Sequence, residues 1–213
     1  SRPGRHRLRS RIATPLAGLV LAVGLLAAAP EARAGDPTLR WRTLRTKHFE
    51  ISFALRHLAA AKRVAVVCEA AHRVLSPFLR HKPRGRVRVL LTDYTDGANG
   101  SASVIPRNVM RLFLSSPDSM STLNDYDDWL VGLIFHEYTH ILHLDTVAGI
   151  SKLLNWIFGK MASPNHLQPS WWIEGIAILS ESRFTSGGRN RNSLYDMYLR
   201  MAVLEQKTHS HSS

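Results

Sequence analysis

The stretch from Tyr126 to Asp145 is apolar around most of the circumference of a helix. Such a helix is stable only when other elements cover it on several sides, so residues 126–145 are expected to form a central buried helix. The chain has 213 residues, 45% apolar and 21% charged, which is enough for one globular domain with a hydrophobic core. The rest of the fold must therefore supply the layers around this segment.

The flanking sequence predicts both strands and further helices. Alternating or β-branched apolar residues predict strands at 49–53, 86–92 and 109–114, with a polar loop at 93–101. Helical spacing predicts helices at about 58–79, 150–161, 171–181 and 193–205. The single cysteine, Cys68, is expected to be a buried small side chain of the first of these. We predict an α+β domain in which a small, mainly antiparallel sheet is covered by helices.

The N-terminal residues have the three parts of an export signal. Five arginines between Arg2 and Arg11 precede an apolar run, Ile12 to Ala29, and Glu31-Ala32-Arg33-Ala34 follows. The run is short for a membrane span, which favours cleavage after Ala34 over a retained anchor. We therefore expect a signal peptide at 1–34, a domain at 35–206 that is truncated at its C-terminus, and a disordered tail at 207–213. The mature protein would be periplasmic, associated with the outer membrane, or secreted.

The positive charge is partly a property of this leader. Removing the six Arg and one Glu of residues 1–34 from the 28 basic and 16 acidic residues lowers the net charge from +12 to +7. The remaining basic clusters, at 80–88 and 183–191, carry no interleaved aromatic residues and no nucleic-acid motif. A solvated basic face is favoured over an anionic partner surface, and nucleic acid is not expected as a partner.

The central helix carries the pattern HExxH, in the residues His136-Glu137-Tyr138-Thr139-His140. Residues four apart on a helix face the same way, so His136 and His140 can bind one metal ion while Glu137 reaches its water. Burying these polar side chains in an apolar helix costs free energy unless they are paired or bind metal.

A third ligand is available downstream, in Trp171-Trp172-Ile173-Glu174-Gly175-Ile176-Ala177. Glu174 lies on a second predicted helix, and two His with one carboxylate form a zinc set that leaves a position open for water. We predict one Zn²⁺ bound by His136, His140 and Glu174. Trp171 and Trp172 are expected to pack this helix against the core.

These residues resemble the gluzincin metallopeptidases, in which HExxH on one helix is completed by a Glu on a following helix. The closer resemblance is to bacterial peptidase MA-like domains, over roughly residues 44–182. It implies a zincin-like fold, a peptide or protein substrate, and Glu137 as the general base. Such domains often precede β-propeller repeats in longer exported proteins. The resemblance therefore also suggests association with the cell envelope and a C-terminal β-propeller beyond the residues of this chain.

Several alternatives stay open at this stage. The Gly-x-Met-Glu-Asn strand of aminopeptidases is absent, and Thr146 stands where a metzincin has its third His. The oxyanion donor could be His166, Tyr195 or Tyr198. A non-catalytic, metal-containing binding module of a larger cell-envelope protein is the alternative function, and a structural domain whose three ligands never meet is a further one.

Other residues have competing interpretations. His143 is too far along the helix to share a metal with His136, so packing or support of a ligand is favoured. Asp145 could orient a ligand imidazole or simply end the helix. The strand around Arg111 could be a sheet edge that binds an extended peptide. The stripe from Ile150 to Met161 is expected to cover a core, in preference to forming a lid or a membrane contact.

Overall fold

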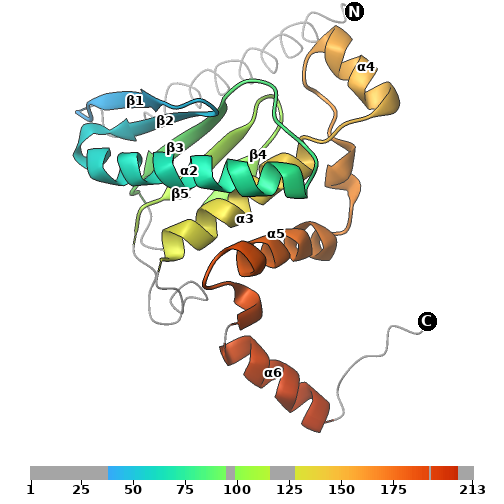
Figure 1. The fold of residues 1–213 in the computed structure, drawn as a ribbon. Helices are drawn as coiled ribbons and strands as arrows, with labels where there is room; N and C mark the ends of the chain where they lie inside the picture. Colours follow the sequence, from blue (N-terminus) through green and yellow to red (C-terminus); the bar gives the residue numbers. More distant parts are fainter. Residues whose placement is uncertain (1–37, 95–98, 116–127, 192, 206–213) are drawn as a thin grey trace, which may run out of the picture. The chain divides into compact units, whose positions relative to one another are not determined.

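The computed structural model describes residues 38–94, 99–115, 128–191 and 193–205. The predicted signal peptide and the predicted C-terminal tail lie outside these ranges. Within these ranges, the residues from Arg40 onward belong to one compact unit. Its strands are β1 (Trp41–Arg45), β2 (Phe49–Ala54), β3 (Val87–Thr92), β4 (Gly100–Ser103) and β5 (Val109–Phe113). Its α-helices are α2 (Leu58–Phe78), α3 (Trp129–Leu144), α4 (Gly149–Phe158), α5 (Ser170–Phe184) and α6 (Ser193–Leu204). The α+β class is thereby confirmed (Figure 1).

The sheet is mixed, so the prediction of a mainly antiparallel sheet is wrong. The strand order is β1-β2-β3-β5-β4, in which β1–β2 and β4–β5 are antiparallel while β2–β3 and β3–β5 are parallel. The physical reason is the connection: α2 carries the chain back across the sheet between β2 and β3, and such a crossover makes the two strands parallel. Strand β5, which contains Arg111, is internal because β4 pairs with its outer side, so the suggestion that it forms a sheet edge is wrong. The two edge strands are β1 and β4.

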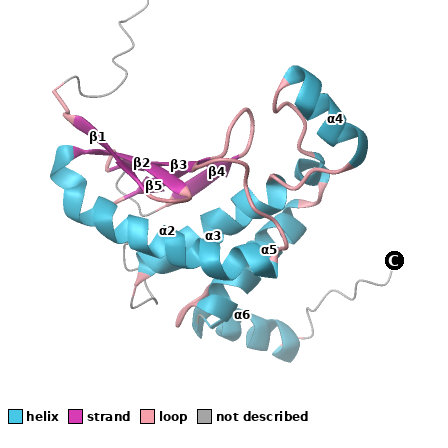
Figure 2. Cartoon of the chain, turned by 45° about the horizontal axis from the view of Figure 1, so that its top comes forward, coloured by secondary structure: helices cyan, strands magenta, loops and turns pink. Residues whose placement is uncertain are grey.

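One face of the sheet packs on helices α2 and α3 (Figure 2). Residues alternate along β3, with Val87, Val89 and Leu91 buried between exposed or half-buried neighbours. Cys68 is buried in this layer as predicted, and burial raises the pKa of its thiol. The core is therefore a two-layer packing of sheet on helices, and α3 lies in its centre with nearly all of its residues buried.

Helix α3 is covered on a further side by α5, which places the third predicted ligand beside the first two. The inward side of α5 carries Ala177, Ser180 and Glu181, whereas Trp171 and Trp172 are 70% and 47% exposed. The expectation that these tryptophans pack against the core is therefore wrong. Helix α4 has no buried residue, so the expectation that its apolar stripe covers a core is also wrong.

None of the helices within the described residues combines the length and the apolar character needed to cross a membrane.

Candidate metal centre

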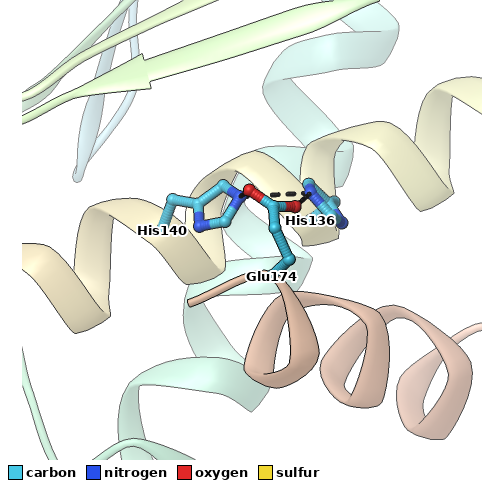
Figure 3. A group of neighbouring side chains, drawn as sticks. All are labelled: His136, His140 and Glu174. Atoms are coloured by element: carbon cyan, nitrogen blue, oxygen red, sulfur yellow. Dashed lines mark hydrogen bonds and ion pairs between the residues drawn. The ribbon is translucent and has the colours of Figure 1, made fainter. Parts of the chain in front are cut away.

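His136, His140 and Glu174 converge at the contact between α3 and α5 (Figure 3). The Nε2 atoms of the two imidazoles are 3.1 Å apart. The Glu174 carboxylate places Oε2 3.2 Å from Nε2 of His136 and Oε1 3.5 Å from Nε2 of His140. One ligand atom from each residue lies within 4.8 Å of the others, so this group could hold a metal ion. The predicted ligand positions are thus brought together by two helices that are far apart in sequence.

A second carboxylate fixes the orientation of His136. Oε2 of Glu181 lies 3.0 Å from Nδ1 of His136, and the Glu181 side chain is buried. Burial works against ionisation of Glu181, but hydrogen bonds with His136 and with the backbone N–H of Arg189 prevail and lower the pKa of its carboxyl. An ionised carboxylate only accepts, so it holds the proton of His136 on Nδ1 and turns the lone pair of Nε2 toward Glu174.

The donor set fits a metal cation. The lone pair of His136 Nε2 faces a carboxylate oxygen of Glu174, and two acceptors at that distance repel unless a proton or a cation lies between them. Burial opposes protonation of His136, but the carboxylates of Glu174 and Glu181 raise the pKa of its imidazole, which shows that this position favours a positive charge. Burial and the neighbouring His136 lower the pKa of His140, which keeps that imidazole available as a neutral ligand.

Glu137 lies on the side of α3 that faces the sheet edge. An added Cβ at Gly100 of β4 would come within 2.8 Å of its Cγ, so the backbone of β4 packs directly on the Glu137 side chain. Burial, with the negative charge of Glu174 as a smaller contribution, raises the pKa of the Glu137 carboxyl to about 7. A carboxyl with that pKa can both accept and release a proton near neutral pH.

These side chains line one pocket of about 430 Å³. It is bounded on one side by residues 99–102, on the β4 edge, and on the other by α3 and α5. Glu174 is about half exposed, so the three-ligand group opens to solvent on the α5 side. The pocket therefore joins a candidate metal group, a proton acceptor and a strand that lies at the edge of the described sheet.

The three oxyanion candidates have different positions. His166 lines the pocket, and its Nδ1 atom lies 2.8 Å from the Ser163 hydroxyl. Tyr198 lies on α6, is more than half exposed, and is outside the pocket lining, while the side chain of Tyr195 is not among those described. Arg189, which sequence reasoning did not select, also lines the pocket, with its Nε atom 3.7 Å from Oε1 of Glu181. His166 and Arg189 therefore contribute nitrogen donor groups to the pocket that contains the ligands.

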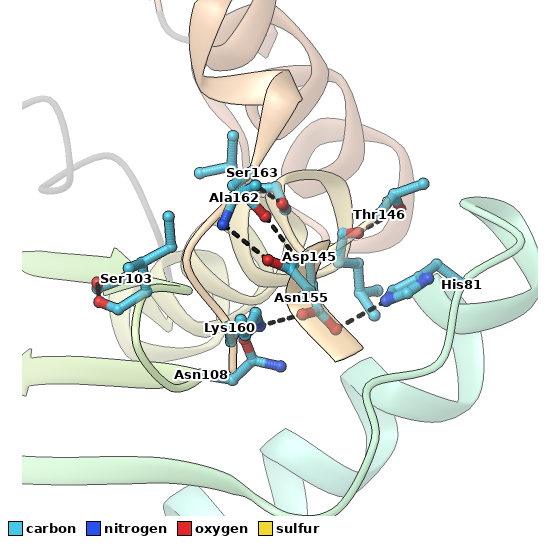
Figure 4. Close-up of polar contacts among 12 residues, drawn as sticks. His81, Ser103, Asn108, Asp145, Thr146, Asn155, Lys160, Ala162 and Ser163 are labelled. Atoms are coloured by element: carbon cyan, nitrogen blue, oxygen red, sulfur yellow. Dashed lines mark hydrogen bonds and ion pairs between the residues drawn. The ribbon is translucent and has the colours of Figure 1, made fainter. Parts of the chain in front are cut away.

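Asp145 has no contact with either ligand imidazole. Its carboxylate pairs instead with Nε2 of His81 at 2.8 Å and with the Lys160 ammonium group, next to Asn108 (Figure 4). These hydrogen bonds prevail over burial and lower the pKa of Asp145. Asp145 therefore ties the end of α3 to the segments before β3 and after α4. His143, on the same turn, lies outside the group of three ligands, as predicted.

The chain was compared with protein families, with curated proteins and with solved structures. None of these comparisons gave a match. The interpretation of the site therefore depends on its own geometry and chemistry.

Proposed function

We propose that the protein is an exported zinc metallopeptidase of the gluzincin type, similar to bacterial peptidase MA-like domains. The observation that carries the proposal is the convergence of His136, His140 and Glu174 in one pocket with Glu137. Zinc is the metal that two imidazoles and one carboxylate most often bind in hydrolases, with a position left open for water. Held there, zinc would supply Lewis-acid chemistry that activates water and polarises a carbonyl.

The other roles belong to the side chains of this chain. Glu137 accepts the proton of the attacking water and later donates it to the leaving amine, a role suited to a carboxyl whose pKa is about 7. Glu181 holds His136 in the tautomer that presents Nε2. We assign to His166 and Arg189, which both line the pocket, the donation of hydrogen bonds to the negative charge that develops on the substrate oxygen.

The substrate would lie extended along β4. This strand is at the edge of the sheet and borders the pocket, so its free backbone groups can pair with a peptide main chain. The same arrangement accounts for Gly100, because a residue without a side chain lets the peptide and Glu137 approach the strand closely.

The decisive experiment compares zinc content and cleavage of a peptide pool by the chain and by its Glu137→Gln variant. We expect about one zinc per chain in both proteins. The unchanged chain should show chelator-sensitive cleavage, and Glu137→Gln should lower the cleavage rate by about 10²- to 10⁴-fold or more. His140→Ala, as a control, should lose zinc and activity together.

The two remaining outcomes separate the alternatives. Equal zinc without cleavage in either protein would support a non-catalytic, metal-containing binding module. Absence of zinc from well-folded protein would refute the metal site itself.

A further inference from the structure

A second pocket, of about 540 Å³, shares no lining residue with the candidate metal centre. Its walls come from the segment that leads into β3, from the β4–β5 connection, from the end of α3 and from α4. Besides Lys160, which pairs with Asp145, six basic side chains line it: Lys82, Arg84, Arg86, Arg88, Arg107 and Lys152. The basic cluster at 80–88, expected from the sequence to be a solvated face, is therefore one wall of a concave site.

Within the described residues, no carboxylate balances the positive charge of these six side chains. None of the six basic side chains forms an ion pair with a carboxylate in the described ranges. The carboxylate in the pocket lining, Asp145, already contacts His81 and Lys160 (Figure 4). Gathering like charges in a concave site costs free energy unless an anion compensates them, so this pocket is suited to an anionic ligand.

The wall formed by α4 adds an apolar surface. Trp156 lines the pocket and is 79% exposed, and Ile150 and Phe158 are exposed to a similar extent. Leu153, Leu154 and Ile157 continue the exposed apolar surface at helical spacing. The helix is held at its end by Asn155, whose side chain accepts from the backbone N–H groups of Met161 and Ala162. An ordered helix thus presents apolar side chains to solvent beside a basic pocket.

We propose that this surface, α4 together with the basic pocket, docks the protein onto a membrane rich in anionic lipid. Helix α4 lies in the interface with its apolar side chains among the acyl chains, and the basic side chains bind lipid phosphates. Each half of the surface has a counterpart in such a membrane. A soluble polyanion would leave the apolar helix unused, and an apolar protein partner would leave the six cations uncompensated. The inference is independent of the proposed peptidase activity.

Binding to vesicles tests the electrostatic half. The full chain is sedimented with vesicles of phosphatidylcholine alone or mixed with phosphatidylglycerol. We expect binding to the anionic vesicles that weakens with added salt. The affinity for these vesicles should fall by at least about 25-fold in Arg84→Glu/Arg107→Glu, since each basic residue contributes roughly fivefold to the affinity. The matched control is Arg42→Glu/Arg73→Glu, which changes two exposed arginines outside the pocket. All variants share the same N-terminal segment, so a difference in binding between them reports the changed arginines.

Fluorescence quenching tests the apolar half. Brominated lipid in the anionic vesicles should quench Trp156, and the quenched fraction should disappear in Trp156→Phe. Val66→Ser changes an apolar residue of α2 that is 71% exposed, and this variant should bind the vesicles and show the same quenching as the unchanged chain.

Equal vesicle binding by the pocket variant and its control would overturn the proposal, as would absence of Trp156 quenching. Binding of inorganic phosphate without vesicle binding would also overturn it and indicate a site for a small soluble anion.

Discussion

The backbone of β4 at Gly100 packs so closely on the Glu137 side chain of α3 that no methyl group fits between them. An added Cβ at Gly100 would lie 2.8 Å from Cγ and 2.9 Å from Oε1 of Glu137. The side chain of Glu137 would have to move, whereas none of the three ligand residues is among the atoms that the added Cβ would meet. Gly100→Ala is therefore a way to displace the proposed base without removing it.

We expect Gly100→Ala to lower kcat by about 10- to 100-fold at unchanged zinc content, because small displacements of a reacting group are costly. Steady-state kinetics with metal analysis measures both. The matched control is Gly175→Ala, next to Glu174, where an added Cβ meets nothing within 4 Å. Inside helix α5 this change should stabilise the fold by about 0.5–1 kcal/mol and leave activity intact. Equal activity loss in both variants would contradict the role given to Gly100.

Glu181 should tune the metal site without binding the metal. Replacing it by Gln removes the negative charge that holds the proton on Nδ1 of His136. We expect Glu181→Gln to weaken zinc affinity by about 10- to 100-fold, as is typical for partners of ligand histidines. Competition with a chromophoric chelator measures the affinity. Asp196→Asn, an exposed change on α6, should have no effect, and unchanged affinity in Glu181→Gln would refute the orienting role.

Among the elements, β2 and α2 are joined by one carboxylate. Oε1 of Glu69 accepts from the backbone N–H of His48 at 2.9 Å, and Oε2 lies 2.7 Å from Nδ1 of the same residue. Burial works against the charged form, but hydrogen bonds from Thr46 and His48 prevail and lower the pKa of Glu69 to about 2. The start of β2 is thereby fixed on the middle of α2.

This pair predicts a pH dependence of stability. A depressed carboxyl pKa stabilises the fold fully above the ordinary value of about 4.5, and the contribution is lost as the pH falls toward about 2. We expect Glu69→Ala to lower the free energy of unfolding by about 1–2 kcal/mol at pH 7, with a difference from the unchanged chain that shrinks below pH about 4.5. Denaturant unfolding at several pH values measures it. A difference independent of pH would show that packing, not charge, is lost.

The elements differ in how well the sequence predicts them. Helices α2 and α3 and strands β2, β3 and β5 follow from local periodicity, because each buries a regular set of apolar side chains. Strand β4 could not be predicted, since Gly100-Ser101-Ala102-Ser103 has no β-branched residue and is extended through pairing with β5. Strand direction depends on how α2 crosses the sheet, which no local pattern encodes.

The candidate site divides in the same way. His136, His140 and Glu137 could be selected from the HExxH spacing, because i and i+4 positions share a helix face. Glu174 could be selected as the carboxylate of a second predicted helix downstream. Glu181 could not, since a glutamate near a helix end is ordinary until its side chain is seen at His136. Arg189 is brought to Glu181 by the turn after α5, in which Gly188 has a φ of 111°. An added Cβ at that glycine would lie only 2.4 Å from the backbone of Ser182.

At the scale of the whole molecule, a bound metal should stabilise the fold, because the ligands belong to two helices packed on each other. With free zinc at about 1,000 times its Kd we expect a gain of about 4 kcal/mol and a marked rise in Tm. Thermal unfolding with and without chelator measures it. His140→Ala should abolish the zinc-dependent rise, whereas His57→Ala, on a histidine paired with Asp93, should retain it. A rise that persists in His140→Ala would place the stabilising ion elsewhere.

The two ligand helices also define a ring in the chain. A metal held between His140 and Glu174 would close a loop of about 35 residues. A covalent cross-link that closes a loop of this length lowers the conformational entropy of the unfolded chain and thereby stabilises the fold by about 4 kcal/mol. Loop-closure entropy grows only logarithmically, so doubling the intervening segment would cost about 0.6 kcal/mol more. The segment that contains α4 can therefore change in length and sequence at little cost to the stability of the metal centre. The exposed surface of α4 is thus free to evolve for contacts of its own.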